Sequence, residues 1–251
     1  MFGVEGRYAG DRMGGLPNQP WPCTAVLRLP AWLSAYPVSR RLGGCGYHPA
    51  NEEGFVMPLV ARDDSLLAVI DLQPRFWGER LDAEDKRCAE EVARRAAWLA
   101  AAVHALGIPA VITEEDPEMN GPTDEAVLAP LRAGAPVFTK TVFGLADCPE
   151  IMAAVRSTGR RTALLAGFET DVCVTHSAVG LGEAGYRVVI VEDAVYSPFG
   201  AHLPGIARLR DLGFEVMRCK SVYYDWIRTL PAARAFQARN PELANPPGFS
   251  L

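Results

Sequence analysis

The sequence of 251 residues lacks the features that would assign it to several common classes of protein. Its six cysteines form no CxxC pair and none stands with histidine at zinc-finger spacing, so neither a disulfide framework nor a structural zinc site is predicted. The longest apolar stretches, such as residues 96–105, are too short to span a bilayer. The formal charge of -5 leaves no excess of basic residues for binding nucleic acid or an anionic membrane.

The first sixty residues have little regular patterning. Glycine and proline interrupt them at short intervals, and no window sustains a helical or an alternating pattern. We therefore expect residues 1–60 to be an irregular or disordered extension; the alternative is that translation begins at Met57 and the residues before it are a mis-annotated start. The first six residues carry no basic segment that leads into an apolar core, so no secretory signal is expected and a cytoplasmic location is predicted.

Strands and helices alternate from residue 65 onward. Apolar runs predict strands at 66–70, 108–113, 136–139, 162–167, 186–191 and 214–217. Helical periodicity and end signals predict helices at 81–106, 150–156, 171–184, 201–212 and 220–229. Strands that are apolar throughout form a parallel sheet with helices on both faces, so residues 61–231 are predicted to be one doubly wound α/β domain. Residues 232–251 are expected to be a polar tail, either solvated or docked on a partner.

Three chemically active side chains follow the carboxyl ends of predicted strands, which is where ligands bind in doubly wound sheets. Asp71 follows the first strand, Lys140 follows the third, and Cys173 lies in the first turn of the helix after the fourth. Each residue alone has a plainer explanation, as a turn aspartate, a solvated lysine or a packed cysteine. Together they predict a carboxylate, an ammonium and a thiol in one crevice.

These three groups have the chemistry of a nucleophilic site. The helix N-terminus and Lys140 both favour the thiolate of Cys173, and the thiolate is the form that attacks a carbonyl carbon. Asp71 is then a general base that takes the thiol proton and a general acid that returns it to the leaving amine. The backbone amides of Glu169 and Cys173 are the predicted oxyanion hole.

Three segments carry a resemblance to a known superfamily. AVIDLQ contains Asp71, FTKTVFGLADCPE contains Lys140, and GFETDVCV, followed by GEAGYRVVIVEDAVYS, contains Cys173. In this order and spacing they resemble the isochorismatase-like cysteine hydrolase superfamily over about residues 66–230. The resemblance is to its metal-free branch rather than to the nicotinamidases.

The resemblance implies a Rossmann-like, three-layer α/β/α fold whose six parallel strands have the order 3-2-1-4-5-6. It also implies that Asp71, Lys140 and Cys173 form a triad that hydrolyses a C–N bond of an amide or carbamoyl group through a thioester intermediate. A non-proline cis peptide bond just before the nucleophile would join Phe168 to Glu169. The protein would be a homo-oligomer.

Differences from the relatives narrow the range of reactions that this chain is expected to catalyse. Nicotinamidases bind a metal through an aspartate and histidines after the second strand, whereas this chain has TEEDPEMNGPT there, without histidine. We expect Glu114, Glu115 and Asp116 to form a solvated acidic turn, with no bound metal and no nicotinamide substrate; a hard cation on this turn is the alternative. Cys173 argues against the vinyl-ether cleavage of true isochorismatases, which lack the nucleophile. Asp171 stands where many relatives have histidine, which leaves the substrate contacts open.

Side chains near the three strand ends are interpreted as walls of a substrate pocket, with core packing as the alternative for the aromatic ones. They are Phe76, Trp77, Phe143 and His176. The GxGxxG pattern at 180–185 ends a predicted helix instead of following a strand, so it predicts a helix stop and not a nucleotide site.

The sequence therefore predicts a hydrolase of a small amide-like molecule that needs no metal and no cofactor. Its expected partners are the small-molecule substrate and further copies of the chain, and neither nucleic acid nor a membrane. Two alternatives belong to other classes: a binding or scaffold protein without turnover, and a redox sensor that is oxidised at Cys173.

Overall fold

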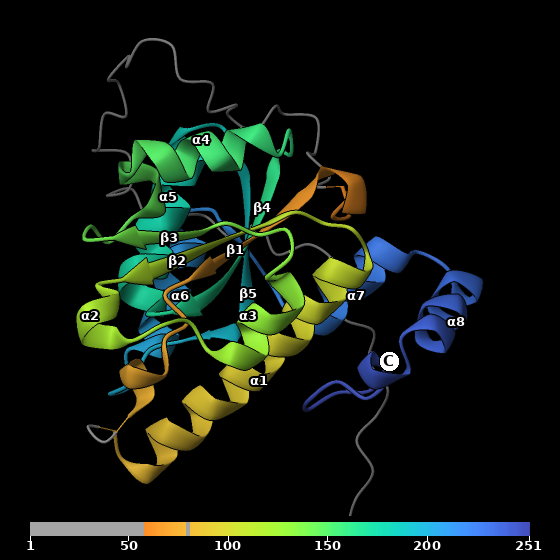
Figure 1. Ribbon diagram of the computed structural model, residues 1–251, viewed down its shortest axis with the longest axis horizontal. Helices are drawn as coiled ribbons and strands as arrows, with labels where there is room; N and C mark the ends of the chain where they lie inside the picture. Colours follow the sequence, from red (N-terminus) through yellow and green to blue (C-terminus); the bar gives the residue numbers. More distant parts are fainter. Residues whose placement is uncertain (1–57, 79–80) are drawn as a thin grey trace, which may run out of the picture. The chain divides into compact units, whose positions relative to one another are not determined.

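The computed structural model describes residues 58–78 and 81–251, which contain a single parallel sheet (Figure 1). The expectations for residues 1–57, including a start at Met57, lie outside these described residues. The strands are β1 (Ser65–Ile70), β2 (Ala110–Glu115), β3 (Val137–Lys140), β4 (Thr162–Phe168), β5 (Arg187–Tyr196) and β6 (Glu215–Met217). All neighbouring strands are parallel in the order β3-β2-β1-β4-β5-β6, which confirms the predicted topology.

Helices cover both faces of this sheet. They are α1 (Ala83–Ala105), α2 (Pro117–Asn120), α3 (Glu125–Leu131), α4 (Pro149–Ser157), α5 (Thr175–Glu183), α6 (His202–Asp211), α7 (Cys219–Ile227) and α8 (Leu230–Arg239). Helices α1, α3, α7 and α8 share one core with the sheet, and α4, α5 and α6 share the other (Figure 1). In β1, Leu67 and Val69 face the first core, whereas Leu66, Ala68 and Ile70 face the second. Every residue of β1 is therefore buried, as its continuous apolar sequence predicts.

Helix α1 lies within the predicted range 81–106 and has a clear signal at each end. The Asp82 carboxylate accepts hydrogen bonds from the backbone N–H groups of Glu84 (3.0 Å) and Asp85 (2.8 Å), which satisfies donors that have no partner within the helix. Gly107, with a φ of 68°, follows the last turn. The left-handed conformation suits glycine and ends the helix.

Of the glycines at 180–185, the last has the role of a helix stop that the sequence predicts, and the other two have a packing role. Gly185 follows α5 with a φ of 87°, as a helix stop does. A Cβ on Gly180 would lie 2.5 Å from the Cβ of Ala146, and one on Gly182 would lie 3.1 Å from the ring of Phe214. These glycines therefore let α5 pack closely against its neighbours.

The C-terminal residues differ from the expected solvated or partner-bound tail. Phe236 of α8 and Leu243 are buried in the core that contains α1. Trp98 of α1 donates a hydrogen bond from Nε1 to the Leu243 carbonyl oxygen (3.0 Å), and the Phe249 ring meets Trp98 edge-on. The sequence misled because Pro231 was taken to end the domain, whereas it lies in the first turn of α8, where a missing N–H is tolerated.

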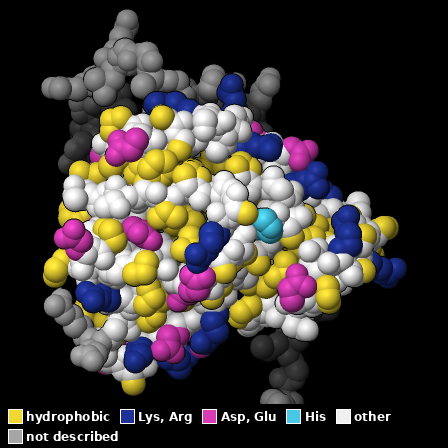
Figure 2. All heavy atoms as spheres, viewed as in Figure 1, with side chains coloured by type: hydrophobic (Ala, Val, Ile, Leu, Met, Phe, Trp, Pro, Cys, Tyr) yellow, Lys and Arg dark blue, Asp and Glu magenta, His cyan; other side chains and the backbone are white. Residues whose placement is uncertain are grey.

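The surface in Figure 2 carries charges of both signs. Acidic and basic side chains are interspersed there with apolar ones, and neither sign covers the face as a continuous patch. Within residues 58–78 and 81–251, no helix is both long enough and apolar enough to cross a membrane.

Candidate active site

Asp71 follows β1 directly, at the place where the winding of the sheet reverses between β1 and β4. Its φ of 47° turns the chain into the left-handed region, and its backbone N–H donates a hydrogen bond to the carbonyl oxygen of Thr113 (3.0 Å). The Thr113 hydroxyl in turn donates to Oδ1 of the Asp71 carboxylate (2.7 Å). The neighbouring strand β2 therefore fixes both the backbone and the side chain of Asp71.

Lys140 ends β3 and reaches the same place from the other side of β2. Its Nζ lies 2.5 Å from Oδ2 of Asp71, and both side chains have an exposed fraction of 0%. The ammonium also donates a hydrogen bond to the carbonyl oxygen of Val142 (3.0 Å). A charge without a partner is very unfavourable at such a position, so each of these two ions stabilises the other.

Cys173 lies on the turn that follows β4. That strand ends at Phe168, and the peptide bond from Phe168 to Glu169 is cis, the geometry that the resemblance implies for this bond. A π-helical turn, Thr170–Val174, comes next and carries Cys173 before α5 begins. The predicted helix at 171–184 is therefore a regular α-helix only from the start of α5.

A glycine lets the turn with Cys173 approach the strand end with Asp71. Gly167 has a φ of 130°, and a Cβ built on it would lie 1.8 Å from the carbonyl oxygen of Ile70. No other residue fits between β1 and β4 at this point. The Cys173 side chain is buried, and its sulfur lies within 4.8 Å of carboxylate oxygens of both Asp71 and Glu115.

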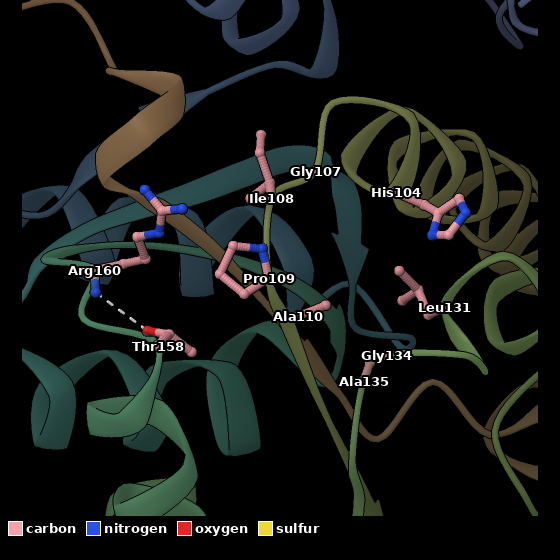
Figure 3. Close-up of a pocket in the computed structure, with 10 residues that line it drawn as sticks. All are labelled: His104, Gly107, Ile108, Pro109, Ala110, Leu131, Gly134, Ala135, Thr158 and Arg160. Carbon is pink, nitrogen blue, oxygen red and sulfur yellow. Dashed lines mark hydrogen bonds between the residues drawn. The ribbon is translucent and has the colours of Figure 1, made fainter.

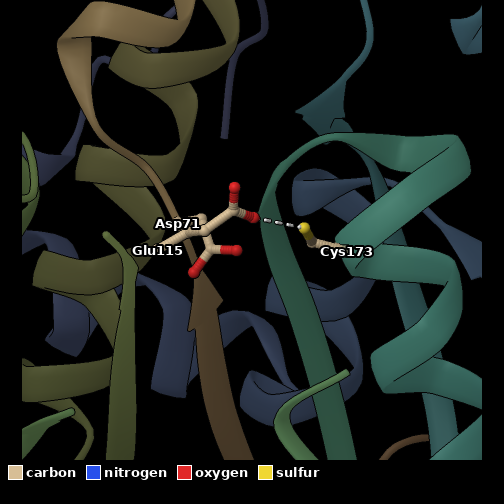
Figure 4. Close-up of side chains that lie close together, drawn as sticks. All are labelled: Asp71, Glu115 and Cys173. Atoms are coloured by element: carbon tan, nitrogen blue, oxygen red, sulfur yellow. Dashed lines mark hydrogen bonds between the residues drawn. The ribbon is translucent and has the colours of Figure 1, made fainter. Parts of the chain in front are cut away.

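Glu115, the last residue of β2, is the fourth charged or nucleophilic group of the site. The Cys173 thiol donates a hydrogen bond to its Oε2 (3.1 Å), and the same oxygen lies 3.8 Å from Nζ of Lys140. Figure 4 shows the two carboxylates, Asp71 and Glu115, side by side and facing the sulfur. The buried Gln73 side chain accepts from the Glu115 backbone N–H (2.8 Å) and donates to the Glu115 carbonyl oxygen (3.1 Å), which fixes the end of β2.

The expectation of a solvated acidic turn at 114–116 is therefore wrong for two of its three residues. Glu114 is almost fully buried and accepts a hydrogen bond from the Thr123 backbone N–H (2.7 Å), on the side of the strand away from the thiol. Glu115 belongs to the site. The predicted strand stopped at Thr113, two residues early, and this error placed Glu115 in a loop.

The protonation of the thiol also differs from the expectation. Burial raises the pKa of Cys173 well above its ordinary value, Asp71 raises it further, Lys140 opposes the shift, and the hydrogen bond to Glu115 adds to it. The predicted preference for the thiolate is wrong because one ammonium does not outweigh burial and two carboxylates. Burial likewise raises the pKa of the Asp71 carboxyl, against the lowering effect of Lys140 and of the Thr113 hydroxyl.

The predicted pocket walls fall into two groups. The exposed ring of Phe143 meets the His176 ring edge-on, with centroids 5.7 Å apart. Trp77 is buried and packs against Phe168, with centroids 5.0 Å apart, while Phe76 is partly buried against the same core. Their contact with a substrate stays a prediction, and so does the oxyanion hole at the Glu169 and Cys173 amides.

One cluster of potential metal ligands occurs in the part of the chain that the structure describes: Asp71, Glu115 and Cys173. Their ligand atoms are close enough to share an ion. The Lys140 ammonium, however, already lies 2.5 Å from Asp71 and supplies positive charge at this place. We therefore assign no metal to these residues, whose contacts are accounted for by the lysine and the thiol.

A separate hollow lies at the opposite, amino edge of the sheet (Figure 3). Its volume is about 430 Å³, and its lining includes His104, Pro109, Thr158 and Arg160. The Arg160 backbone N–H donates a hydrogen bond to the Thr158 hydroxyl (3.2 Å), as in an ordinary turn. None of the predicted site residues lines this hollow.

The fold and the site define a doubly wound α/β protein with a thiol, two carboxylates and an ammonium at the switch point of its sheet. The family model described as "Isochorismatase domain" matches residues 65–221. The chain therefore belongs to the isochorismatase domain family and has the fold of isochorismatase-like hydrolases.

Individual relatives agree with this family. Isochorismatase domain-containing protein 2 of Danio rerio is 34% identical over 151 residues, which cover 59% of this chain and 72% of that protein. Isochorismatase domain-containing protein 1 of Danio rerio is 39% identical over 93 residues, 37% of this chain, and the match spans only 32% of that protein's length.

A solved structure shares the fold. It is the YcaC gene product from Escherichia coli, described as an octameric hydrolase of unknown specificity. The TM-score is 0.64 at 18% sequence identity, and the alignment covers 75% of this chain and 94% of that chain. At this identity the likeness concerns the fold alone.

Proposed function

We propose that this protein is a cysteine hydrolase that cleaves a C–N bond of a small amide or carbamoyl compound through a thioester on Cys173. The observation that supports the proposal best is the buried Asp71–Lys140 ion pair, with 2.5 Å between its charged atoms, beside a thiol. A buried ion pair is costly to retain for stability alone. Buried ionisable groups that gather at the switch point of a doubly wound sheet are characteristic of catalysis.

The reaction has two halves. In the first, a carboxylate beside the sulfur takes the thiol proton, a role that the sequence assigns to Asp71, and the sulfur attacks the carbonyl carbon. The Glu169 and Cys173 amides stabilise the oxyanion, and the proton returns to the nitrogen as the C–N bond breaks. In the second half, water attacks the thioester, the acid is released and the thiol regains a proton.

The charges of the site suit this order of events. Because the pKa of Cys173 is raised, the resting nucleophile at neutral pH is the thiol, so attack requires a base in contact with it. The Asp71 carboxyl, whose pKa is raised by burial, is closer to the range in which one group serves as both base and acid. The Lys140 ammonium stabilises the thiolate as it forms.

The redox-sensor alternative is disfavoured by the same features. A sensor cysteine is exposed and has a low pKa, so that its thiolate meets the oxidant. Cys173 has an exposed fraction of 4% and a raised pKa. We propose in addition a homo-oligomeric assembly and a cytoplasmic location; the octameric state of the Escherichia coli protein supports the first.

The proposal is tested by screening small amides, ureas and carbamoyl compounds for hydrolysis with the wild-type protein and with Cys173→Ala. We expect at least one compound to be hydrolysed by the wild type and its turnover to fall by more than about 10³-fold in the variant, since the nucleophile is lost. Equal hydrolysis by the two proteins would refute the covalent mechanism. Release of ammonia or amine that does not depend on residue 173 would also refute the covalent mechanism.

A further inference from the structure

The second carboxylate of the site has no role in the scheme that the sequence predicts. Both oxygens of Asp71 are engaged, Oδ1 by the Thr113 hydroxyl at 2.7 Å and Oδ2 by the Lys140 ammonium at 2.5 Å. The Cys173 thiol donates a hydrogen bond to Oε2 of Glu115, at 3.1 Å, and it also lies within hydrogen-bonding reach of the Asp71 carboxyl. Proton transfer follows an existing hydrogen bond, and the Glu115 oxygen that accepts it lies 3.8 Å from Lys140, whereas the Asp71 oxygens are held more tightly by Thr113 and Lys140. Glu115 is therefore in position to receive this proton.

The position of Glu115 is also fixed by its surroundings, unlike that of an acid on the surface. The two hydrogen bonds from the fully buried Gln73 side chain fix its backbone at the end of β2. Alternation along the strand then directs it to the same side as Thr113, which binds Asp71. Its side chain has an exposed fraction of 24%, whereas those of Asp71 and Lys140 have 0%. Of the two carboxylates that face the sulfur, Glu115 is thus the one that a substrate nitrogen can reach.

We infer that Glu115 is a catalytic residue: it accepts the proton of the Cys173 thiol as the sulfur attacks, and it donates that proton to the nitrogen that leaves. The S–H bond breaks and an O–H bond forms on Glu115 while the S–C bond is made. The O–H bond then breaks, an N–H bond forms, and the C–N bond cleaves to leave a thioester and a neutral amine or ammonia. Asp71 stays paired with Lys140 throughout this half-reaction.

This inference rests on the proposed cysteine hydrolase function and reassigns one role within it. The charged groups that act on the sulfur come from three strands: Asp71 after β1, Glu115 at the end of β2 and Lys140 at the end of β3. Glu169, on the turn before the sulfur, lies near enough to Glu115 for the two carboxylates to repel each other. Removing the charge of Glu115 should therefore lower the pKa of the Cys173 thiol.

The experiment compares Glu115→Gln with Glu114→Gln. The matched control changes the neighbouring residue in the same way, and a glutamine oxygen at 114 can still accept from the Thr123 backbone N–H. Each protein is assayed for hydrolysis of the compound found in the Cys173-dependent screen. Each is also alkylated with iodoacetamide from pH 6 to about pH 10, and modification of Cys173 is followed by mass spectrometry.

We expect Glu115→Gln to change catalysis and thiol reactivity in opposite directions. Turnover falls by about 10²- to 10⁴-fold because the base is lost. Alkylation of Cys173 becomes faster at neutral pH, because a carboxylate that raises the pKa of the thiol has been removed. Glu115→Asp restores part of the turnover, and Glu114→Gln matches the wild type in both assays.

Two results would overturn the inference and leave the cysteine hydrolase proposal standing. One is Cys173-dependent hydrolysis by Glu115→Gln at the wild-type rate and with the wild-type pH profile. The other is an unchanged alkylation profile in Glu115→Gln, which would mean that this carboxylate does not contact the thiol. Failure of the cysteine hydrolase proposal itself gives a different result, equal hydrolysis by wild type and Cys173→Ala.

Discussion

The two edges of the sheet differ in what they bury. At the carboxyl edge, Asp71 and Lys140 are a fully buried ion pair beside a buried thiol, and the chain there adopts a cis peptide bond and a left-handed aspartate. At the amino edge lies the hollow of about 430 Å³, lined by ordinary turns and by the end of α1. The hollow at the amino edge offers space without buried charges, and the carboxyl edge has the chemistry.

This difference shows which observation locates a site in such a fold. A hollow between turns forms wherever helices and strands meet imperfectly, and it requires no unfavourable group. Buried charges and left-handed non-glycine residues are unfavourable unless their surroundings hold them, so they mark a place where function has been selected. A change at the carboxyl edge should therefore have a larger effect than its counterpart at the amino edge.

The largest expected effect is on folding, from replacing the glycine between β1 and β4. In Gly167→Ala the new Cβ would lie 1.8 Å from the Ile70 carbonyl oxygen, so the two central strands cannot keep their pairing. Gly107→Ala at the amino edge meets no atom within 4 Å and has only its φ of 68° to oppose it. That variant should lose about 1–2 kcal/mol of unfolding free energy.

Urea denaturation followed by circular dichroism measures both glycine variants. We expect Gly167→Ala to be recovered unfolded or to lose well over twice the stability that Gly107→Ala loses. Similar midpoints for the two variants would contradict the close approach of β1 and β4 at Gly167.

The next effect concerns the ion pair. Lys140→Met leaves Asp71 as a buried charge without its partner. We therefore expect the free energy of unfolding to fall by about 3–5 kcal/mol and turnover to be unmeasurable. Adding Asp71→Asn to this variant removes the unpaired charge and should restore part of the stability but none of the activity. Arg160→Ala, at the amino edge, should change the stability by less than about 0.5 kcal/mol and leave turnover unchanged.

Thermal and urea unfolding of these three variants and the wild type, together with activity on the screened compound, test this prediction. A Lys140→Met protein as stable as Arg160→Ala would mean that the charges are solvated in solution. Full activity in it would remove Lys140 from the mechanism.

The sequence predicts the fold because its strands leave little choice. The run 66–70 is apolar at every position, which fits only a strand covered on both faces, and parallel strands joined by helices then have one economical winding. Asp71, Lys140 and Cys173 were found for the same reason: each follows a strand, and parallel strands end at one edge.

The rest of the site depends on where a strand stops, which local patterning does not fix. Glu115 was lost because polar residues after Thr113 look like a turn, although alternation places 113 and 115 on one side and 114 on the other. The raised pKa of the thiol was missed for a related reason, since it depends on the carboxylate of Glu115 and on burial that only the folded chain creates. Helix α8 was missed because its buried side chains are few and Phe236 packs against Tyr223 of α7, a partner that only the folded chain supplies.

The most direct test of the central claim is to trap the enzyme during turnover. The wild-type protein is mixed with the compound identified in the screen, quenched in acid within milliseconds to seconds, and analysed by intact mass and peptide mapping. We expect an added mass equal to the acyl group of the substrate, located on the peptide that contains Cys173. Turnover of that compound with no acyl adduct at Cys173 at any quench time, and with activity retained in Cys173→Ala, would contradict the account.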